Sequence, residues 1–357
     1  MPSSTIVHAA VFAVGALVGG GVATAVSART RRDALPPSVA APVPAPVSTQ
    51  TTPPPPVIDV KPGVGTKMET APGSLMQVDT AVLKYGNPGP ISDLLVRRAY
   101  VAGYDRRLRH PAWTAEHLTL ASLGKSALEP RSTDEAGDRA NSQFTEDASI
   151  PAMFRAKLSD YFRSGYDRGH MVPAADAKIS QAAMDETFLL TNIAPQVGSG
   201  FNRHYWAYVE DWCRRLTSTF ADVYVFTIPL YLPKLDTDGK WRVCHEVIGN
   251  PPNISVPTHF AKVVLASKPS SPSRPDIPEI STGAFVLPNA VIPDEAKLES
   301  FVVPIEAVER AAGLTLFSDA VKANSKHICK TTKCDVIVRR FDDAIKRSDR
   351  KAIAGPK

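Results

Sequence analysis

Proline is the residue whose distribution most constrains what this chain can fold into. Nine of the 32 prolines lie between Pro36 and Pro56, in a stretch that holds no charged residue. Proline fixes φ and removes a backbone donor, and this composition offers too few bulky side chains to bury a core. We therefore expect residues 35–77 to be a disordered spacer and residues 78–345 to form the folded domain. That length suits one large α/β domain.

The amino-terminal 34 residues combine an apolar run with arginines that follow it. Residues 6–26 carry no formal charge, and Arg29, Arg31 and Arg32 come directly afterwards. The run is long enough to span a bilayer as a helix. A secretory signal carries its positive charge before the apolar run, so the order of charges disfavours secretion. We expect residues 1–34 to be a membrane anchor or targeting segment, and residues 346–357 to be a basic tail.

Charge and cysteine content narrow the possible partners only slightly. The formal net charge of +5 is compatible with a polyanionic partner but does not identify one. None of the four cysteines forms a CxxC pair, and no zinc-finger spacing is present, so structural zinc is not expected. The favoured interpretation is four free thiols. A local disulfide between Cys329 and Cys334 in an oxidising compartment is the alternative.

Periodicity predicts a mixed set of helices and strands. Residues 205–217 form an amphipathic pattern, residues 305–312 form another that ends at Gly313, and the apolar run at 223–229 predicts a buried strand. The other predictions are helices at 91–98, 152–163, 181–185 and 342–348, strands at 100–104, 112–118, 166–172 and 258–266, and a Pro-rich loop at 268–280.

Two polar motifs interrupt this pattern. In the first, Asp167, Arg168 and Gly169 precede His170 beside a predicted strand, and the glycine would let a second backbone or a ligand approach closely. A structural histidine is the alternative. The second motif places Asn202, Trp206, Glu210 and Arg214 four residues apart, so they share one helix face. Read alone, that face could be solvated and carry a Glu–Arg pair.

Taken together, the two motifs resemble the signature of the DNA/RNA non-specific nuclease family. The match is Asp167-Arg168-Gly169-His170 followed by Asn192-x3-Gln196-x5-Asn202-x3-Trp206-x3-Glu210. The similarity extends over residues 80–345 and is greatest to the mitochondrial endonuclease G branch in its fungal form. It implies an α/β (α+β) fold of the ββα-metal, or His-Me finger, type, with a central, mostly antiparallel sheet flanked by helices.

The resemblance also implies a role for each residue of the motifs. His170 is expected to be the general base, since imidazole titrates near working pH. Asn202 is expected to be the single protein ligand of Mg²⁺, for which Mn²⁺ could substitute, because a neutral amide leaves the charge of the ion available to phosphate. Glu210 would hold the waters of the ion. Arg168 and Arg139 would bind the scissile phosphate, which suits the guanidinium fork.

Three further residues are expected to support this site. Asn192 would hydrogen bond the attacking water or the phosphate and so contribute to catalysis. Gln196 is placed around the metal-binding helix and Arg214 is expected to pair with Glu210, and both are predicted to help bind the substrate.

The predicted function is sugar-non-specific hydrolysis of DNA and RNA that leaves 5′-phosphate ends, because contacts to phosphate and metal read neither bases nor the 2′-hydroxyl. The resemblance further implies a homodimer in the mitochondrial intermembrane space or at the inner membrane, held by the amino-terminal segment, with possible relocation to the nucleus for DNA fragmentation in cell death. A secreted scavenging nuclease is one alternative. A catalytically weak nucleic-acid-binding relative is the other, and the presence of His170 and Asn202 argues against it.

Overall fold

A computed structural model describes residues 89–125, 136–271 and 273–338. The predicted anchor at 1–34, the spacer at 35–77, the helix expected at 342–348 and the basic tail lie outside these residues. Among the helices of the described ranges, none has the length and apolar character needed to cross a bilayer.

An eight-stranded sheet organises the described domain. The strand order is β1-β2-β3-β6-β11-β12-β13, and β14 pairs with β12. All pairings are antiparallel except the one between β12 and β14. The strands are β1 (Ser92–Val96), β2 (Tyr100–Asp105), β3 (His110–Leu118), β6 (Asp222–Leu230), β11 (His259–Ser271), β12 (Arg274–Pro288), β13 (Val302–Val303) and β14 (Lys326–His327). A mixed fold with a large, mostly antiparallel sheet is therefore confirmed.

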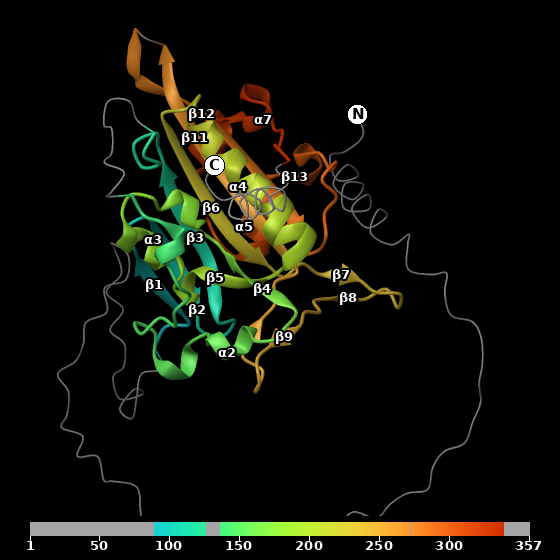
Figure 1. Ribbon diagram of the computed structural model, residues 1–357. Coiled ribbons are helices and arrows are strands. Elements are labelled where there is room, and N and C mark those ends of the chain that lie inside the picture. Colours follow the sequence, from blue (N-terminus) through green and yellow to red (C-terminus); the bar gives the residue numbers. More distant parts are fainter. Residues whose placement is uncertain (1–88, 126–135, 272, 339–357) are drawn as a thin grey trace, which may run out of the picture. The chain divides into compact units, whose positions relative to one another are not determined.

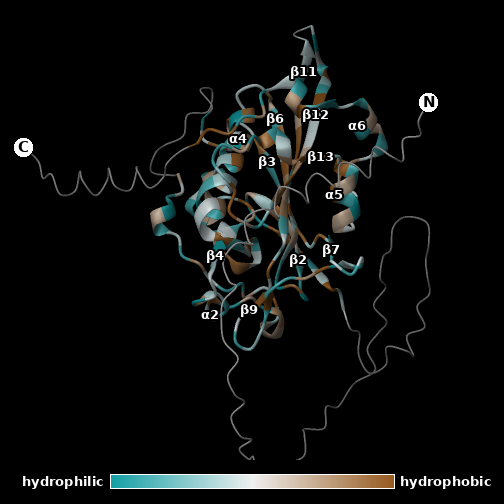
Figure 2. Ribbon diagram, turned by 90° about the vertical axis from the view of Figure 1, so that its right-hand side faces the viewer, coloured by the Kyte–Doolittle hydropathy of each residue, from teal (hydrophilic) through white to brown (hydrophobic). Residues whose placement is uncertain are grey.

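Helices cover both faces of this sheet, with α4 (Ala207–Leu216) on one face and α5 (Ile305–Ala312) on the other (Figures 1 and 2). Strand β11 shows why both faces are apolar. Its Phe260 and Val264 pack in the core that contains α4, whereas Val263 packs in the core that contains Val308 of α5. Alternate side chains of a strand point to opposite faces, so a strand that is covered twice needs apolar residues at successive positions.

The remaining elements are short. Three two-stranded ladders are β4 (Tyr166–His170) with β5 (Ile193–Val197), β7 (Lys234–Leu235) with β8 (Trp241–Arg242), and β9 (Val247–Ile248) with β10 (Ile254–Ser255). The helical segments are η2 (Arg139–Asn141), η3 (Ala152–Phe154), α2 (Leu158–Tyr161), η4 (Ala174–Asp176), α3 (Gln181–Thr187), η5 (Leu190–Asn192), η6 (Gly198–Trp206), η7 (Leu298–Phe301), α6 (Asp319–Asn324) and α7 (Ile328–Thr331).

Three predicted segments are wrong, each because tertiary contacts override local pattern. Residues 91–98 hold strand β1, all five residues of which pair with β2. Residues 268–271 and 274–280 continue strands β11 and β12 instead of forming a loop, and Pro269 lies opposite Pro278, so these two prolines share one register position. The helix expected at 152–163 is reduced to η3 and α2, because the backbone of Arg155 and Lys157 between them is extended.

The cysteines also differ from the favoured expectation. Cys329 and Cys334 form a disulfide with Cα atoms 5.2 Å apart, which is the alternative that the sequence left open. Cys213 is a buried free thiol and Cys244 an exposed one. The expectation of four free thiols is therefore wrong for the carboxy-terminal pair.

Candidate active site

The two motifs are brought together by a hairpin that continues into a helix. Strand β4 pairs with β5, with His170 opposite Ile193 and Asp167 opposite Gln196. The chain then runs through η6, whose backbone is non-helical at Ser199 and Gly200, directly into α4. Asn202 thus lies on η6 soon after the hairpin, and Glu210 lies on α4, about two turns beyond Asn202.

Gly169 allows the hairpin to close tightly. A Cβ atom added to it would lie 2.1 Å from Oε1 of Gln196 and 2.2 Å from its Cδ. No side chain fits at that distance, so the absence of a Cβ, which the sequence already suggested as the reason for a glycine here, is required by Gln196.

His170 is a buried, neutral imidazole. Its ring lies edge-on to Phe188 with centroids 4.8 Å apart and is tilted against Phe144 at 5.3 Å. Burial, and then the nearby charge of Arg139, lower the pKa of His170 to about 3. Its Nε2 atom is buried and has no hydrogen-bond partner among the described residues. The ring is therefore unprotonated at neutral pH.

Aromatic packing orients His170. Nε2 of the imidazole has no hydrogen-bond partner among the described residues. The two phenyl rings hold it instead. Phe144 belongs to the segments that resemble the nuclease family, but nothing in the sequence pointed to Phe188.

Two arginines lie over the same phenyl rings. The guanidinium carbon of Arg168 is 4.4 Å from the centroid of Phe144, and that of Arg139 is 5.4 Å from the centroid of Phe188. Within the described ranges, neither arginine forms an ion pair with a carboxylate. An arrangement of two cations beside one neutral imidazole favours a doubly coordinated anion such as phosphate.

Asn202 is held by the first residue of the DRGH motif. Its Nδ2 donates to Oδ2 of Asp167 at 2.9 Å, and Arg203 donates two further hydrogen bonds to the same carboxylate. Burial opposes ionisation of Asp167, but the hydrogen bonds from Arg203 and Asn202 lower its pKa, so it stays charged. Because the amide nitrogen is engaged, the carbonyl oxygen of Asn202 is the atom that remains available as a ligand.

Glu210 lies in a buried network of charges. Burial raises the pKa of Glu210 to about 7, against the opposing effect of Lys262 and Arg214. Lys262 is almost fully buried in β11 and its Nζ donates to the carbonyl oxygen of Met171, next to His170, at 3.3 Å. Arg139 acts electrostatically on both His170 and Glu210, which places the base and the carboxylate around one arginine.

The sequence analysis missed Lys262, although a single lysine inside an otherwise apolar strand is a usable signal. Its Nζ donates to Thr227 at 2.6 Å and lies 3.8 Å from Oε1 of Glu116. Burial, together with the charge of nearby Asp176, raises the pKa of Glu116 well above its usual range.

Three predicted contacts are corrected. Asn192 is fully buried, and its amide donates to the carbonyl oxygens of Val172 and Thr187 and accepts from the Val172 N–H. It therefore braces the backbone after His170 and has no free atom for water or phosphate. Gln196 is fully buried and cannot touch a polymer. Arg214 donates to Asp176 at 2.7 Å instead of pairing with Glu210. Its guanidinium group is therefore engaged inside the protein.

No cluster of three or more His, Cys, Asp or Glu side chains arranged to hold a metal is found in the described residues. Mg²⁺ keeps several waters and needs few protein ligands.

On the β4–β5 hairpin a neutral histidine lies beside two arginines that form no ion pair within the described ranges, an arrangement that suits cleavage of phosphodiesters. The sequence profile of the DNA/RNA non-specific endonucleases matches residues 78–323. The chain belongs to this family. It is an endonuclease that acts on nucleic acids, in a family of metal-dependent nucleases.

Individual relatives agree with this assignment. The chain is 49% identical over 271 residues to the mitochondrial nuclease 1 of Schizosaccharomyces pombe, and the aligned region covers 76% of this chain and 80% of the relative. It is 51% identical over 278 residues to the mitochondrial nuclease of Saccharomyces cerevisiae, covering 77% and 81%. The crystal structure of an EndoG/EndoGI complex superposes with a TM-score of 0.59 at 43% identity and covers 69% of this chain and 94% of that one. The fold is thus that of the EndoG-like nucleases.

Proposed function

We propose that this enzyme hydrolyses DNA and RNA alike by a one-metal mechanism, with His170 as general base and Asn202 as the metal ligand, and leaves 5′-phosphate ends. The observation that carries the proposal is the neutral imidazole of His170 between two arginines, on a β4–β5 hairpin that leads into the helix of Asn202 and Glu210. The proposal includes the ββα-metal arrangement that the motifs predicted.

The residues present fit Mg²⁺, with Mn²⁺ as a substitute. Asn202 offers a neutral carbonyl oxygen because its nitrogen is bonded to Asp167. Hard divalent ions prefer oxygen ligands, and a single amide suits an ion that retains its waters. Glu210 would accept hydrogen bonds from these waters. When bound, such an ion neutralises phosphate charge and stabilises the leaving oxygen.

The protein's own side chains provide the remaining chemistry. His170 takes a proton from the attacking water, for which a neutral ring is required. Arg139 and Arg168 bind phosphate oxygens and stabilise the charge that builds up in the transition state. Because these contacts go to phosphate, the sugar and the base are not selected, and DNA and RNA are both substrates.

We further propose a mitochondrial location, in the intermembrane space or at the inner membrane. The relatives named above are mitochondrial nucleases, and the Cys329–Cys334 disulfide fits an oxidising compartment. In this proposal residues 1–34 anchor the enzyme, residues 35–77 tether the domain at 78–345, and two copies form a homodimer. Release to the nucleus in cell death would follow removal of the anchor.

The test is cleavage of supercoiled plasmid and of single-stranded RNA by the wild type, His170→Ala and Asn202→Ala, each with EDTA, Mg²⁺ or Mn²⁺. We expect cleavage of both substrates by the wild type only when metal is present, and a loss of at least about 100-fold in kcat for each variant. His117→Ala and Asn324→Ala, at more exposed positions, are the matched controls and should match the wild type. Full activity of His170→Ala would overturn the assignment of the base.

A further inference from the structure

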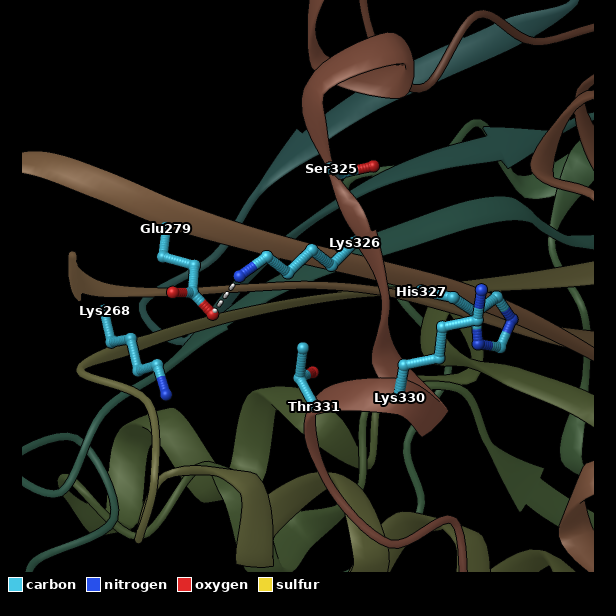
Figure 3. A pocket seen from close by; sticks show the side chains of 7 residues that line it. All are labelled: Lys268, Glu279, Ser325, Lys326, His327, Lys330 and Thr331. Atoms are coloured by element: carbon cyan, nitrogen blue, oxygen red, sulfur yellow. Dashed lines mark ion pairs between the residues drawn. The ribbon is translucent and has the colours of Figure 1, made fainter.

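A basic pocket lies at the far end of the β11–β12 hairpin, away from the catalytic motifs. It has a volume of about 500 Å³ and is open to solvent. Figure 3 shows the side chains around it: Lys268 from β11, Glu279 from β12, and Lys326, His327, Lys330 and Thr331 from the segment that runs through β14 and α7.

The carboxy-terminal wall of this pocket is fixed in several ways. Lys326 of β14 pairs in parallel register with Ser281 of β12. The Thr331 hydroxyl donates to Oγ of Ser281 at 3.0 Å, and the Cys329–Cys334 disulfide closes the loop that holds Lys330 and Thr331. The wall is therefore preorganised, which reduces the entropy lost when a ligand binds.

The charges of the pocket favour an anion. Three lysines face one carboxylate, and Nζ of Lys326 pairs with Oε1 of Glu279 at 3.3 Å. In the described part of the chain, Lys268 and Lys330 form no ion pair with a carboxylate, and Nζ of Lys268 lies 5.5 Å from the centroid of the Phe220 ring. The pocket therefore keeps a net positive charge for a ligand.

His327 supplies a neutral donor beside these lysines. Its Nδ1 accepts the backbone N–H of Cys329 at 3.2 Å, so the proton of the neutral ring is on Nε2. Burial, and then the charge of Lys330, lower the pKa of His327, which favours that neutral form. The neutral N–H donor of His327 and the ammonium groups of the pocket suit the non-bridging oxygens of a backbone phosphodiester.

We propose that this pocket is a second phosphate site, which binds the sugar-phosphate backbone of the nucleic acid at a distance from the cleaved bond. This inference depends on the proposed function in one respect, which is that the ligand is taken to be nucleic acid. Lys268 and Lys262 lie on the same strand six residues apart, or about 20 Å, and Lys262 reaches the backbone beside His170. At about 3.4 Å per nucleotide of a duplex strand, a substrate shorter than about six nucleotides cannot reach both places.

The test compares Lys268→Gln/Lys330→Gln with a control of equal charge, Lys240→Gln/Lys297→Gln, whose lysines are exposed and lie outside the pocket. Binding of a 30-base-pair duplex is measured in EDTA in a His170→Ala background, so no cleavage occurs. Each phosphate contact adds about 0.9 to the slope of log K against log salt. We expect the pocket variant to lower that slope by about two and the control to leave it within about 0.5.

Cleavage adds a readout that a structural defect would not reproduce. With Mg²⁺ and His170 restored, Lys268→Gln/Lys330→Gln should raise KM for the duplex without changing kcat. The kcat/KM for a pentanucleotide should not change. An equal loss on the pentanucleotide, or a salt slope equal to that of the control, overturns the proposal. If the wild type cleaves neither substrate, the proposed function fails, whereas the binding arm still decides the pocket.

Inorganic phosphate separates the two sources of the ligand. The NMR signals of His327 are followed while phosphate, and then the uncleaved duplex, is added to the His170→Ala protein. The proposal expects the duplex to shift these signals and to displace phosphate. A response to phosphate that the duplex does not compete with would assign the pocket to a free anion and overturn the nucleic-acid proposal.

Discussion

Replacing Gly169 by alanine tests how the hairpin that carries His170 is built. The new Cβ would lie 2.1 Å from Oε1 of Gln196, whereas an ordinary contact begins near 3.4 Å, so the amide must move by about 1.3 Å. Gln196 is fully buried and has little room to move. Overpacking of this kind costs about 1–3 kcal/mol, and we expect Gly169→Ala to lower the free energy of unfolding by about 2 kcal/mol.

A double-mutant cycle makes the argument specific. Neither amide atom of Gln196 has a hydrogen-bond partner among the described residues, so Gln196→Ala removes the obstacle without breaking a hydrogen bond seen there. The double variant should therefore be about 1–2 kcal/mol more stable than the sum of the two single losses predicts. Urea unfolding followed by circular dichroism at pH 7.5 measures all four proteins. Gln143→Ala, at an exposed position, is the control second mutation and should add independently to Gly169→Ala.

The same cycle reports on catalysis. Strand β4 carries both Arg168 and His170, so a displaced hairpin should lower kcat for plasmid cleavage in Gly169→Ala, and Gln196→Ala should restore part of it. If the two mutations add within about 0.5 kcal/mol, Gln196 is not what forbids a side chain at position 169, and the packing argument is refuted.

Two further predictions concern stability. Asp147 is buried and accepts hydrogen bonds from Arg97 at 2.5 Å and Thr191 at 2.6 Å, so Asp147→Ala should lower the free energy of urea unfolding by about 3–5 kcal/mol. Asp238→Ala, at an exposed ion pair, is the control and should cost far less, so equal losses would contradict the argument. Burial lowers the pKa of His110 to about 4, so only the unfolded chain takes up a proton at this residue as the pH falls below about 6.5. Between pH 7.5 and 5.5 the wild type should therefore lose about 1.4 kcal/mol of stability that His110→Asn does not lose. Parallel pH profiles of stability for the two proteins would refute this prediction.

The strength of local pattern decided which elements could be predicted from the sequence. Helix α4 and strand β6 were predicted within two residues of their bounds, because each has an unambiguous period and a clear neighbouring turn. Helix α5 ends where Gly313 adopts a left-handed conformation with φ of 69°, as expected of a helix that stops at glycine. Strand β1 was missed because its partner β2 determines its conformation, and nothing local to residues 91–98 encodes that partner.

The same limit applies to the site. The motifs identified the residues that can do chemistry, but not which of them remain free to do it. Asn192 and Arg214 are polar residues at motif positions, and each is occupied by partners far away in the chain or on the backbone. Conversely, Lys262 and Phe188 enter the site from a strand and a helix end that carry no motif, so only the assembled fold reveals them.

One buried polar atom without a partner belongs to a proposed catalytic group. Within the described residues such atoms occur at several places, including Nε of Arg97, Oγ1 of Thr114 and the hydroxyl of Tyr161, and also on His170, Gln196, Trp206 and Glu116. Native proteins satisfy nearly all such groups, because each orphan costs about 1–3 kcal/mol. Most of these residues have no place in the proposed chemistry, so an orphan alone does not mark a site. Nε2 of His170 differs because two arginines lie over the rings that hold the imidazole, and a water or phosphate bound there would satisfy it.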